Sequence, residues 1–551
     1  MVDSKNIIAG NHWLLVVLLF LFWTSAGALQ FVFFYPDEMH YTDAAIQMVE
    51  THDYLTPYKA DGTPRFLKPI LTYWLVVPGY HIFGIKYFSS RILFWLAGGF
   101  LAAFVYYMAL SISKDRRIAL AGALLTASNP MVMMSATRSI PDIVLAFFLT
   151  LSAWGFVSIL NHEKPEKRYY WMAYLGAALA FATKGLPAAA YAGFSFLFLW
   201  LNPWNRISIR RSIRILPAIV AVVIAVGWFA AMYVLHGREY LHSFYEDQVG
   251  YRVTSAVALF LKNGFLALIN LILFLLPWSV IILIVWKRKK NLRFTKFPDK
   301  AITGYIIGYV LFTLLLSSFV FKFYDRYLLP AIPMISVLLA HMIVEVHTSV
   351  ISGATKILFR INMILAGFLV FILITVGSNW QLIAGLLVTS LIVLTYVFQW
   401  HKRLPHYFLL ANLLMMLFLN GNILIGSLIF PEPGEQLARR IETYGTPSSD
   451  VLYVYDHIHI ASKLRISTGN SLAVKDIESL QDIPYGSDSM VVFRKEHLHE
   501  FSTEKYEILS GSDEWDKLDP RRFPGFLQKT IAQLKESGEK FFLARPLPVG
   551  Q

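Results

Sequence analysis

The stretch WLLVVLLFLFWTSAGALQFVFFYPDEMHY, residues 13–41, places two adjacent carboxylates directly after a long uncharged apolar run. The run, residues 13–34, has about the twenty residues that a helix needs to cross a bilayer. The acid pair, Asp37 and Glu38, follows it at once. The stretch therefore predicts a retained membrane-spanning first helix with an acid pair just beyond its end.

The rest of the chain repeats this apolar pattern. Of the 551 residues, 56% are hydrophobic and only 15% are charged, and uncharged windows of about twenty residues recur, so we expect a polytopic α-helical membrane protein. The net charge of +13 sits in short basic clusters between apolar runs, which is typical of cytoplasmic loops rather than of nucleic-acid binding. The absence of cysteine excludes disulfides, thiolate catalysis and Cys-ligated metal sites.

The basic clusters predict the topology. If all six face the cytoplasm, the spans between them must come in pairs, which gives about 13 transmembrane helices with the N-terminus inside. A short apolar segment, residues 69–83, contains Pro78 and Gly79 and is expected at the outer interface without crossing. The predicted spans lie near residues 13–34, 89–111, 118–136, 141–160, 170–183, 186–201, 215–236, 260–286, 301–320, 327–347, 361–378, 381–399 and 406–429.

The sequence changes character near residue 431. Residues 1–430 are expected to form the transmembrane domain, with outer loops at 35–88 and 237–261, and residues 431–551 a small extracytoplasmic α/β domain. Four segments of the tail read as strands, DVLYVYD, SMVVFRKE, KYEILS and KFFLARP. Two segments, EQLARRIETYG and FLQKTIAQLKESG, have helical spacing, with Gly445 and Gly538 as C-caps.

This topology brings polar residues from separate stretches to one face. Where Lys and Arg surround an acid pair, the cations can bind an anion while one carboxylate acts as a base. This combination suits a transfer reaction with an anionic leaving group. The residues expected on this outer face are Asp37, Glu38, Arg65, Lys68, Arg138, Asp142, Lys184, Glu246, Asp247, Arg252, Lys322 and Arg326.

Several of these residues, and Tyr327 beside Arg326, also have simpler explanations. An acid pair at a helix end is usually solvated, and Lys68 or Lys184 can extend to lipid headgroups. Arg138 and Asp142 are spaced to form an i,i+4 ion pair, and Tyr327 can be an interfacial aromatic. The convergence of many such residues on one face, rather than any one of them, favours a functional site.

In chain order, several stretches resemble the polyprenyl-phosphate-sugar-dependent glycosyltransferases of the GT-C class, in the protein O-mannosyltransferase superfamily. The nearest resemblance is to bacterial aminoarabinose transferases that modify lipid A. The matching stretches are PDEMHYTDAAIQMVETHDYLTP, GTPRFLKPILTYW, ATRSIPDIVLAFF, FATKGLPA, FYEDQVGYR, LLPW and SSFVFKFYDRYLLPAIP.

The resemblance implies a reaction and roles for residues. The donor is a sugar on polyprenyl (undecaprenyl) phosphate, used at the outer face of the bacterial inner membrane. The acceptor is a hydroxyl or phosphate of lipid A or another envelope glycan, or a protein hydroxyl. The implied acids at the reaction centre are Asp37, with Glu38 beside it, and Asp142. The residues implied at the donor phosphate are Lys68, Arg252, Tyr327 and Lys184. We include Lys322 and Arg65 as further candidates for binding this phosphate.

Two departures from the family bear on metal binding. Leu67 stands where the family commonly has Glu before Lys-Pro, and Asp247 and Gln248 stand where aminoarabinose transferases carry a His. Those family positions resemble a metal pair, so the departures argue against a divalent metal site and weaken the assignment of an aminoarabinose donor. A sugar monophosphate leaving group can be stabilised by cations alone, so we expect no cofactor to be required.

Two other classes remain open from the sequence. A lipid-linked sugar transporter or flippase would have charges lining a path near the bilayer midplane, whereas here they gather at helix ends. A non-catalytic receptor would use the tail as its binding module. Within the enzyme hypothesis, Asp37 is the base or acceptor-orienting group, and Glu38 holds the loop or its basic neighbours in place.

Overall fold

The structure is a computed structural model of one chain. It describes residues 11–30, 36–250, 256–280, 299–345, 348–376, 404–423, 433–445, 451–483, 489–501, 505–514 and 539–547, with five isolated positions between 383 and 394. The chain forms two compact units. We call Met1–Ala28, Phe66–Thr72 and Leu93–Leu424 the helical unit, and Leu29–Arg65, Tyr73–Ile92 and Ile425–Gln551 the mixed unit.

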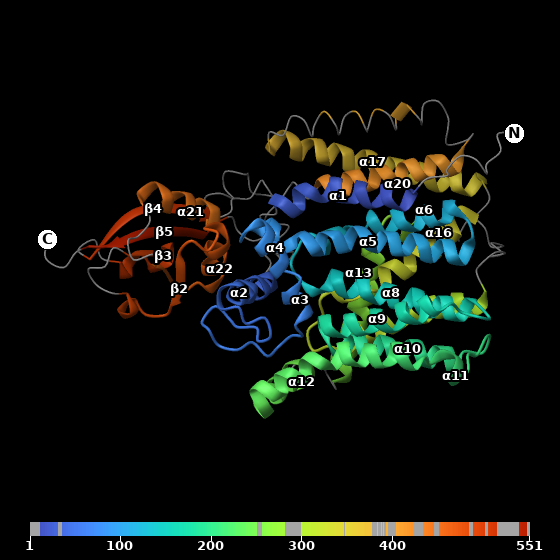
Figure 1. Cartoon of the computed structure of the whole chain (residues 1–551). Helices are drawn as coiled ribbons and strands as arrows, with labels where there is room; N and C mark the ends of the chain where they lie inside the picture. Colours follow the sequence, from blue (N-terminus) through green and yellow to red (C-terminus); the bar gives the residue numbers. More distant parts are fainter. Residues whose placement is uncertain are drawn as a thin grey trace. The chain divides into compact units, whose positions relative to one another are not determined.

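Apolar helices make up the helical unit (Figure 1). Seven described helices are long and apolar enough to cross a membrane, or eight if the bent pair α6 and α7 is one span. The helices are α1 (His12–Gln30), α5 (Tyr87–Ser113), α6 (Arg116–Ala127), α7 (Pro130–Ala136), α8 (Pro141–Asn161), α9 (Lys167–Lys184), α10 (Leu186–Leu201), α11 (Ile209–Ser212), α12 (Ile215–Tyr245), α13 (Val257–Phe274), α15 (Lys300–Ser318), α16 (Ala331–Glu345), α17 (Thr348–Val376) and α20 (Pro405–Ile423). The last two residues of α1 and the first six of α5, up to Ile92, belong to the mixed unit.

These helices confirm the predicted class, a multi-pass α-helical membrane protein with a small C-terminal sheet. The count of 13 spans is not confirmed, and the span predicted at residues 381–399 lies almost entirely outside the described residues. The segment expected at the outer interface forms two short helices, α3 (Leu71–Trp74) and α4 (Val77–Phe83). Seven residues of helix extend only about 10 Å, which is too short to cross a bilayer.

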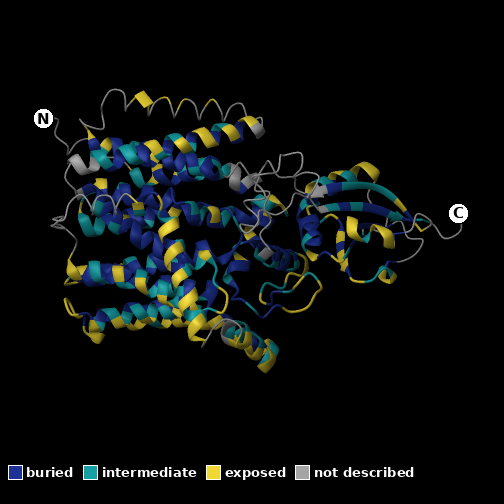
Figure 2. Cartoon of the chain, turned by 180° about the vertical axis from the view of Figure 1, so that it is seen from behind, coloured by how far each residue is buried: buried dark blue, intermediate teal, exposed yellow. Residues whose placement is uncertain are grey.

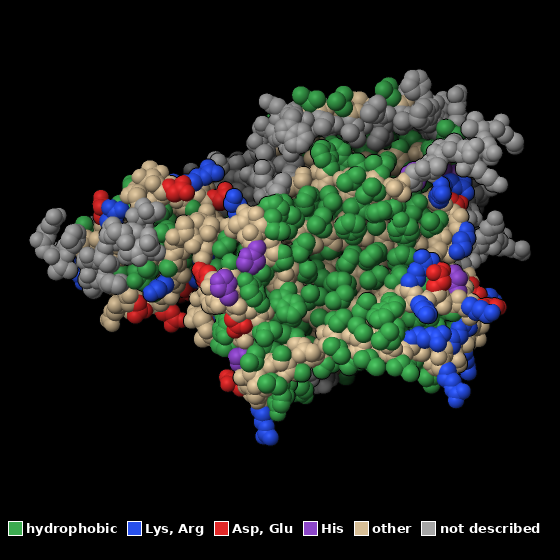
Figure 3. All heavy atoms as spheres, in the orientation of Figure 1, with side chains coloured by type: hydrophobic (Ala, Val, Ile, Leu, Met, Phe, Trp, Pro, Cys, Tyr) green, Lys and Arg blue, Asp and Glu red, His purple; other side chains and the backbone are tan. Residues whose placement is uncertain are grey.

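The side chains of the helical unit are sorted by environment. Buried residues fill its interior (Figure 2), and α12 and α13 leave most of their apolar side chains at least partly exposed, as expected of lipid-facing helices. Lys and Arg gather at one end of the unit (Figure 3). There Tyr170 Oη donates to the Arg211 carbonyl at 2.8 Å, which joins two of the basic clusters. Their shared end agrees with the topology predicted from charge.

Helices α8 and α9 pack closely because glycines face the neighbouring backbone. A Cβ on Gly155 would lie 2.4 Å from the Ala173 nitrogen, and one on Gly176 would lie 2.6 Å from the Ser152 nitrogen. Small residues at such crossings let membrane helices approach each other. The antiparallel pair therefore brings the start of α8 beside the end of α9.

Helix α12 is interrupted at Gly237, whose φ of 63° and ψ of −145° are not helical. Glycine adopts this positive φ without the steric cost that a Cβ would add. The segment after Gly237 continues as helix to Tyr245 and then as a π-helical turn, η1 (Glu246–Gly250). The part of the predicted outer loop that runs from residue 238 to Gly250 is thus helical.

The mixed unit combines α2 (Pro36–Thr51) and α4 with a five-stranded sheet of order β2-β1-β3-β5-β4. Strands β2 and β3 flank β1 in parallel, and β5 runs antiparallel to β3 and β4. The elements of the tail are α21 (Pro433–Tyr444), β1 (Val451–Tyr455), α22 (Ile458–Ser467), β2 (Ala473–Ile477), η4 (Leu480–Asp482), β3 (Met490–Arg494), η5 (Lys495–Glu500), β4 (Tyr506–Glu514) and β5 (Glu539–Pro546).

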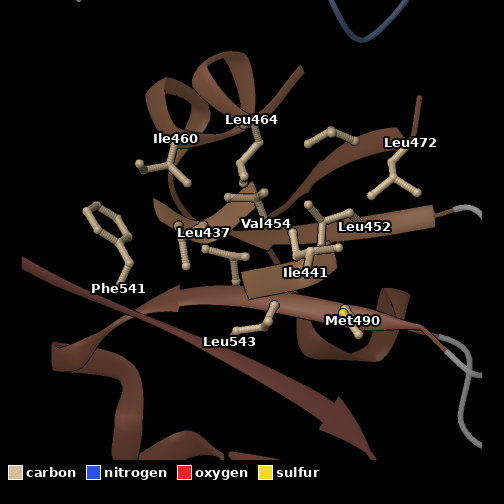
Figure 4. Packing of buried hydrophobic residues seen from close by; sticks show 13 residues of the cluster. Leu437, Ile441, Leu452, Val454, Ile460, Leu464, Leu472, Met490, Phe541 and Leu543 are labelled. Atoms are coloured by element: carbon tan, nitrogen blue, oxygen red, sulfur yellow. The ribbon is translucent and has the colours of Figure 1, made fainter. Parts of the chain in front are cut away.

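One face of the sheet packs against α21 and α22. Leu437 and Ile441 of α21 and Ile460 and Leu464 of α22 meet Val454 and its neighbours in one buried cluster (Figure 4). Burial of such apolar side chains, worth roughly 1.5–3 kcal/mol each, fixes which face of α22 turns toward the sheet.

All four predicted strands and the first predicted helix of the tail are present, and Gly445 follows α21 with a φ of 87°. Strand β2 and helix α22 were not predicted, because the short sequence IHIASKLRIS mixes polar and apolar residues without a clear period. The second predicted helix, with Gly538, lies outside the described residues. The mixed unit also takes in most of the loop predicted at 35–88, which the sequence assigned to the transmembrane domain.

Candidate functional site

Lys68 of the helical unit is paired with Asp247. Its Nζ lies 2.9 Å from Asp247 Oδ2, and the two side chains are only 9% and 18% exposed. The residues are 179 positions apart, and Asp247 lies on η1, just after the end of α12. The cation expected at the donor phosphate is therefore held by a carboxylate, which a phosphate group could replace.

Contacts within the helical unit fix the segment that carries Lys68. The Phe66 ring packs against His236 and Tyr240 of α12, with ring centroids 5.0 and 5.4 Å apart. Thr72 Oγ1 donates to the Thr183 carbonyl at 3.3 Å. Because Thr183 precedes Lys184, the segment that carries Lys68 lies beside the end of α9.

A second charged group surrounds Asp142, at the start of α8. Lys184 Nζ lies 2.5 Å from Asp142 Oδ1, and Arg326 Nε lies 3.4 Å from Oδ2. The Asp142 side chain is 4% exposed. An acid in the first turn of one helix and a cation in the last turn of another both suit the helix dipoles. We call Asp142, Lys184, Arg326 and Tyr327 the Asp142 cluster.

Aromatic rings complete the Asp142 cluster. Lys184 Nζ lies 4.8 Å from the centroid of Tyr327, within cation–π range. The Arg326 guanidinium lies 4.5 Å and the Lys322 ammonium 5.3 Å from the centroid of Tyr324. Lys322 itself is exposed. The sequence suggested Arg138 as an i,i+4 partner of Asp142. In the structure, cations from α9 and from η2 (Asp325–Leu328) contact Asp142.

In the mixed unit, α2 begins with the acid pair. Asp37 is partly exposed, whereas Glu38 is fully buried. Arg91 donates two hydrogen bonds to Glu38, from Nε to Oε1 at 2.7 Å and from Nη2 to Oε2 at 2.9 Å. Both side chains are almost completely buried, at 0% and 1% exposure. This contact suits the holding role considered for Glu38 from the sequence, which stays a prediction, and Asp37 is the more accessible acid.

His40 lies one turn after Asp37 on α2. Burial, with the nearby charge of Arg65 acting in the same direction, lowers the pKa of His40 to about 4, although the charge of Asp37 acts in the opposite direction. His459 and Lys59 also act on His40 and lower its pKa. The imidazole is therefore neutral at physiological pH and can accept or donate a hydrogen bond.

Arg65, expected near the donor phosphate, is 6% exposed and lies in the mixed unit. Its Nε donates to Tyr73 Oη at 3.0 Å, and the Tyr73 ring packs against Tyr41 of α2. Its charge lowers the pKa of His40, so it lies in the surroundings of α2. Arg252 lies outside the described residues, and its predicted role stays a prediction.

Sequence reasoning missed Arg91. It is the first charge in the apolar span predicted at 89–111, and a charge in such a position normally has a buried partner. That signal could have pointed to an acid such as Glu38. Among the described residues, no group of three or more His, Asp or Glu side chains is arranged to hold a metal ion. The expectation that no cofactor is required stays a prediction.

Parts of the chain are similar in sequence to known proteins. Residues 67–230 match the family model described as dolichyl-phosphate-mannose-protein mannosyltransferase. An undecaprenyl phosphate-α-4-amino-4-deoxy-L-arabinose arabinosyl transferase of Proteus mirabilis is 24% identical over 60% of this chain and 58% of its own length. An uncharacterised protein of Aquifex aeolicus is 27% identical over 55% of this chain and 58% of its own length. The chain thus matches less than two thirds of the length of these relatives.

The whole fold has a solved counterpart. The crystal structure of ArnT from Cupriavidus metallidurans bound to undecaprenyl phosphate superposes with a TM-score of 0.70, covering 97% of this chain and 98% of that one at 16% identity. The apo form of the same protein gives 0.67. The chain therefore has the fold of a GT-C class glycosyltransferase. Within that class, the resemblance to the aminoarabinose transferases predicted from the sequence is confirmed.

Proposed function

We propose that this protein is a glycosyltransferase that moves a sugar from a polyprenyl phosphate to an acceptor on the outer face of a bacterial inner membrane. One observation carries the proposal. Three buried or half-buried cations, Lys68, Lys184 and Arg326, lie in the helical unit against carboxylates rather than in solvent. Such cations suit a lipid-linked phosphate at the membrane surface.

The chemistry follows from these groups. An acceptor oxygen attacks the anomeric carbon of the donor sugar, and the bond from that carbon to the phosphate oxygen breaks. Polyprenyl phosphate leaves with the electron pair, and Lys68, together with the cations of the Asp142 cluster, stabilises its added charge. Asp37 takes the proton of an attacking hydroxyl. A single displacement of this kind inverts the anomeric centre.

The names of the relatives support the finer assignment. Undecaprenyl phosphate-linked aminoarabinose is the donor named for the curated relatives, and undecaprenyl phosphate is the lipid named in the ArnT structure. We take the same lipid as the donor carrier and lipid A or another envelope glycan as the acceptor. The departures at Leu67 and Asp247 make other sugars reasonable donors.

The test uses purified protein in liposomes with undecaprenyl phosphate that carries either labelled aminoarabinose or labelled mannose, and with purified lipid A as acceptor. Release of undecaprenyl phosphate together with labelled lipid A is the expected result. Label found on protein instead would make the enzyme a protein O-glycosyltransferase. Movement of the intact donor between leaflets without release of undecaprenyl phosphate would show a flippase and refute the proposal.

A further inference from the structure

Helix α2 is held on two sides by buried ion pairs. Glu38 is bound by Arg91, and Asp43 is bound by Ser462 and Arg465 of α22. At about 100° per residue, Glu38 lies about 100° from Asp37 around the helix and Asp43 about 120° from it in the other direction. Asp37 therefore lies between the two held faces.

The contact at Asp43 uses both of its carboxylate oxygens. Ser462 Oγ donates to Oδ1 at 3.0 Å, and Arg465 Nη1 donates to Oδ2 at 3.1 Å. The side chains of Arg465 and Asp43 are only 7% and 6% exposed. Burial raises the pKa of Asp43, whereas the positive charge of Arg465 and the Ser462 bond oppose this shift by favouring the carboxylate.

Arg465 also connects this contact to the sheet. Its Nη2 and Nε donate to the Val474 carbonyl on β2, at 3.2 and 3.4 Å. At the far end of α2, Asn470 donates to Glu50. The apolar face of α22, with Ile460 and Leu464, packs on the sheet. The sheet thus fixes α22, and the polar face of α22 fixes α2.

A buried ion pair is a poor way to gain stability, because apolar residues of similar volume often stabilise a protein as well or better. Its advantage is geometric, since a carboxylate held by a guanidinium and a hydroxyl allows few orientations. The residues involved are 422 positions apart, so this pair makes the orientation of α2 depend on the C-terminal domain.

We propose that Arg465 is a positioning residue for the transfer reaction: through Asp43 it sets the orientation of α2, and thereby the placement of Asp37 relative to the acceptor oxygen. The inference rests on the proposed function and adds a role for the C-terminal domain. A shift of about 1 Å in a reacting group can cost about a hundredfold in rate, so a small rotation of α2 is enough to matter.

The experiment compares Arg465→Met, Arg465→Lys and the control Arg439→Met in liposome-reconstituted full-length protein. Arg439 lies in the mixed unit as well, and it forms an exposed pair with Glu435 at 3.8 Å. Turnover and KM are measured with the undecaprenyl phosphate-sugar that the wild type uses. Hydrogen exchange of the amides of residues 39–48 is measured in parallel, and it reports on α2 without any substrate.

Arg465→Met is expected to lower kcat by about 10- to 100-fold with KM for the donor nearly unchanged, because donor phosphate ligands are untouched. Exchange in α2 should accelerate, Arg465→Lys should recover part of both effects, and Arg439→Met should match the wild type. Normal kcat in folded Arg465→Met protein, or a lower kcat with unchanged exchange in α2, would overturn the inference.

Two failures are distinguishable. If the wild type releases no undecaprenyl phosphate from either donor, the proposed function fails, while the exchange data still decide whether Arg465 orders α2. If Arg465→Met does not fold, Asp43→Asn decides, because the amide keeps the shape of the side chain and removes the carboxylate charge that Arg465 holds. Unchanged kcat and unchanged exchange in folded Asp43→Asn protein would then refute the positioning role.

Discussion

Arg91 and Glu38 form a two-bond ion pair with side chains that are 0% and 1% exposed. The pair joins the first turn of α2 to the start of α5, two elements whose contacting residues are 53 positions apart. Both carboxylate oxygens of Glu38, the acid next to the proposed base, are thus bound by Arg91. Adjacent acids in the sequence therefore have different environments in the structure.

Glu38→Gln should lower the free energy of unfolding by about 3–5 kcal/mol, because it leaves the Arg91 charge buried and uncompensated. Thermal unfolding in detergent measures the effect. Glu166→Gln is the matched control, since Glu166 pairs with Arg168 at 2.9 Å on the surface and should change stability by less than about 1 kcal/mol. The double variant Glu38→Leu with Arg91→Met should recover most of the stability. Wild-type stability in Glu38→Gln would contradict the holding role.

Asp37→Asn should reduce transfer by about 10²–10⁴-fold while leaving the binding of undecaprenyl phosphate nearly intact, because the amide cannot accept the proton. Turnover and lipid binding are measured on the same reconstituted sample. Asp482→Asn, an exposed acid on η4 of the same unit, serves as control and should be fully active. Full turnover in Asp37→Asn would remove Asp37 from the reacting centre.

Lys68→Ala should weaken binding of undecaprenyl phosphate by about 10- to 100-fold, the equivalent of one charge-assisted hydrogen bond. Asp247→Asn should act in the opposite direction and tighten binding, because Asp247 competes with phosphate for the Lys68 ammonium. Lys262→Ala, at an exposed position on α13, is the control. Equal weakening by the Lys68 and Asp247 variants would mean that the pair is structural.

Acid should destabilise the mixed unit partly through His40. Its pKa is about 4 in the folded chain against 6.5 for an ordinary histidine, so below pH 6.5 the unfolded chain binds the proton first. The stabilising contribution is complete above pH 6.5 and is lost as the pH falls toward 4. His40→Gln should therefore lose less stability between pH 7 and pH 5 than the wild type. His52→Gln, at an exposed position, should follow the wild-type pH profile, and identical profiles for all three proteins would refute the assignment.

The membrane helices and most of the tail could be predicted because their signals are local. A run such as residues 13–34 is apolar whatever surrounds it, and the alternation in DVLYVYD predicts β1 by itself. Helix α22 was missed because its residues serve two partners. Ile460 and Leu464 meet the sheet while Ser462 and Arg465 meet α2, so the apolar pattern is diluted.

The sequence by itself determined the membrane class, and it predicted a candidate set of polar residues that includes Asp37, Lys68 and Asp142. Only the tertiary structure decided which charge holds which, pairing Lys68 with Asp247, Glu38 with Arg91 and Asp43 with Arg465. Hydropathy is a property of a window of neighbouring residues. Ion pairs between residues 53 to 422 positions apart depend on which distant segments the fold brings together. In these three pairs, burial makes each charge depend on its partner, because an unpaired buried charge is costly.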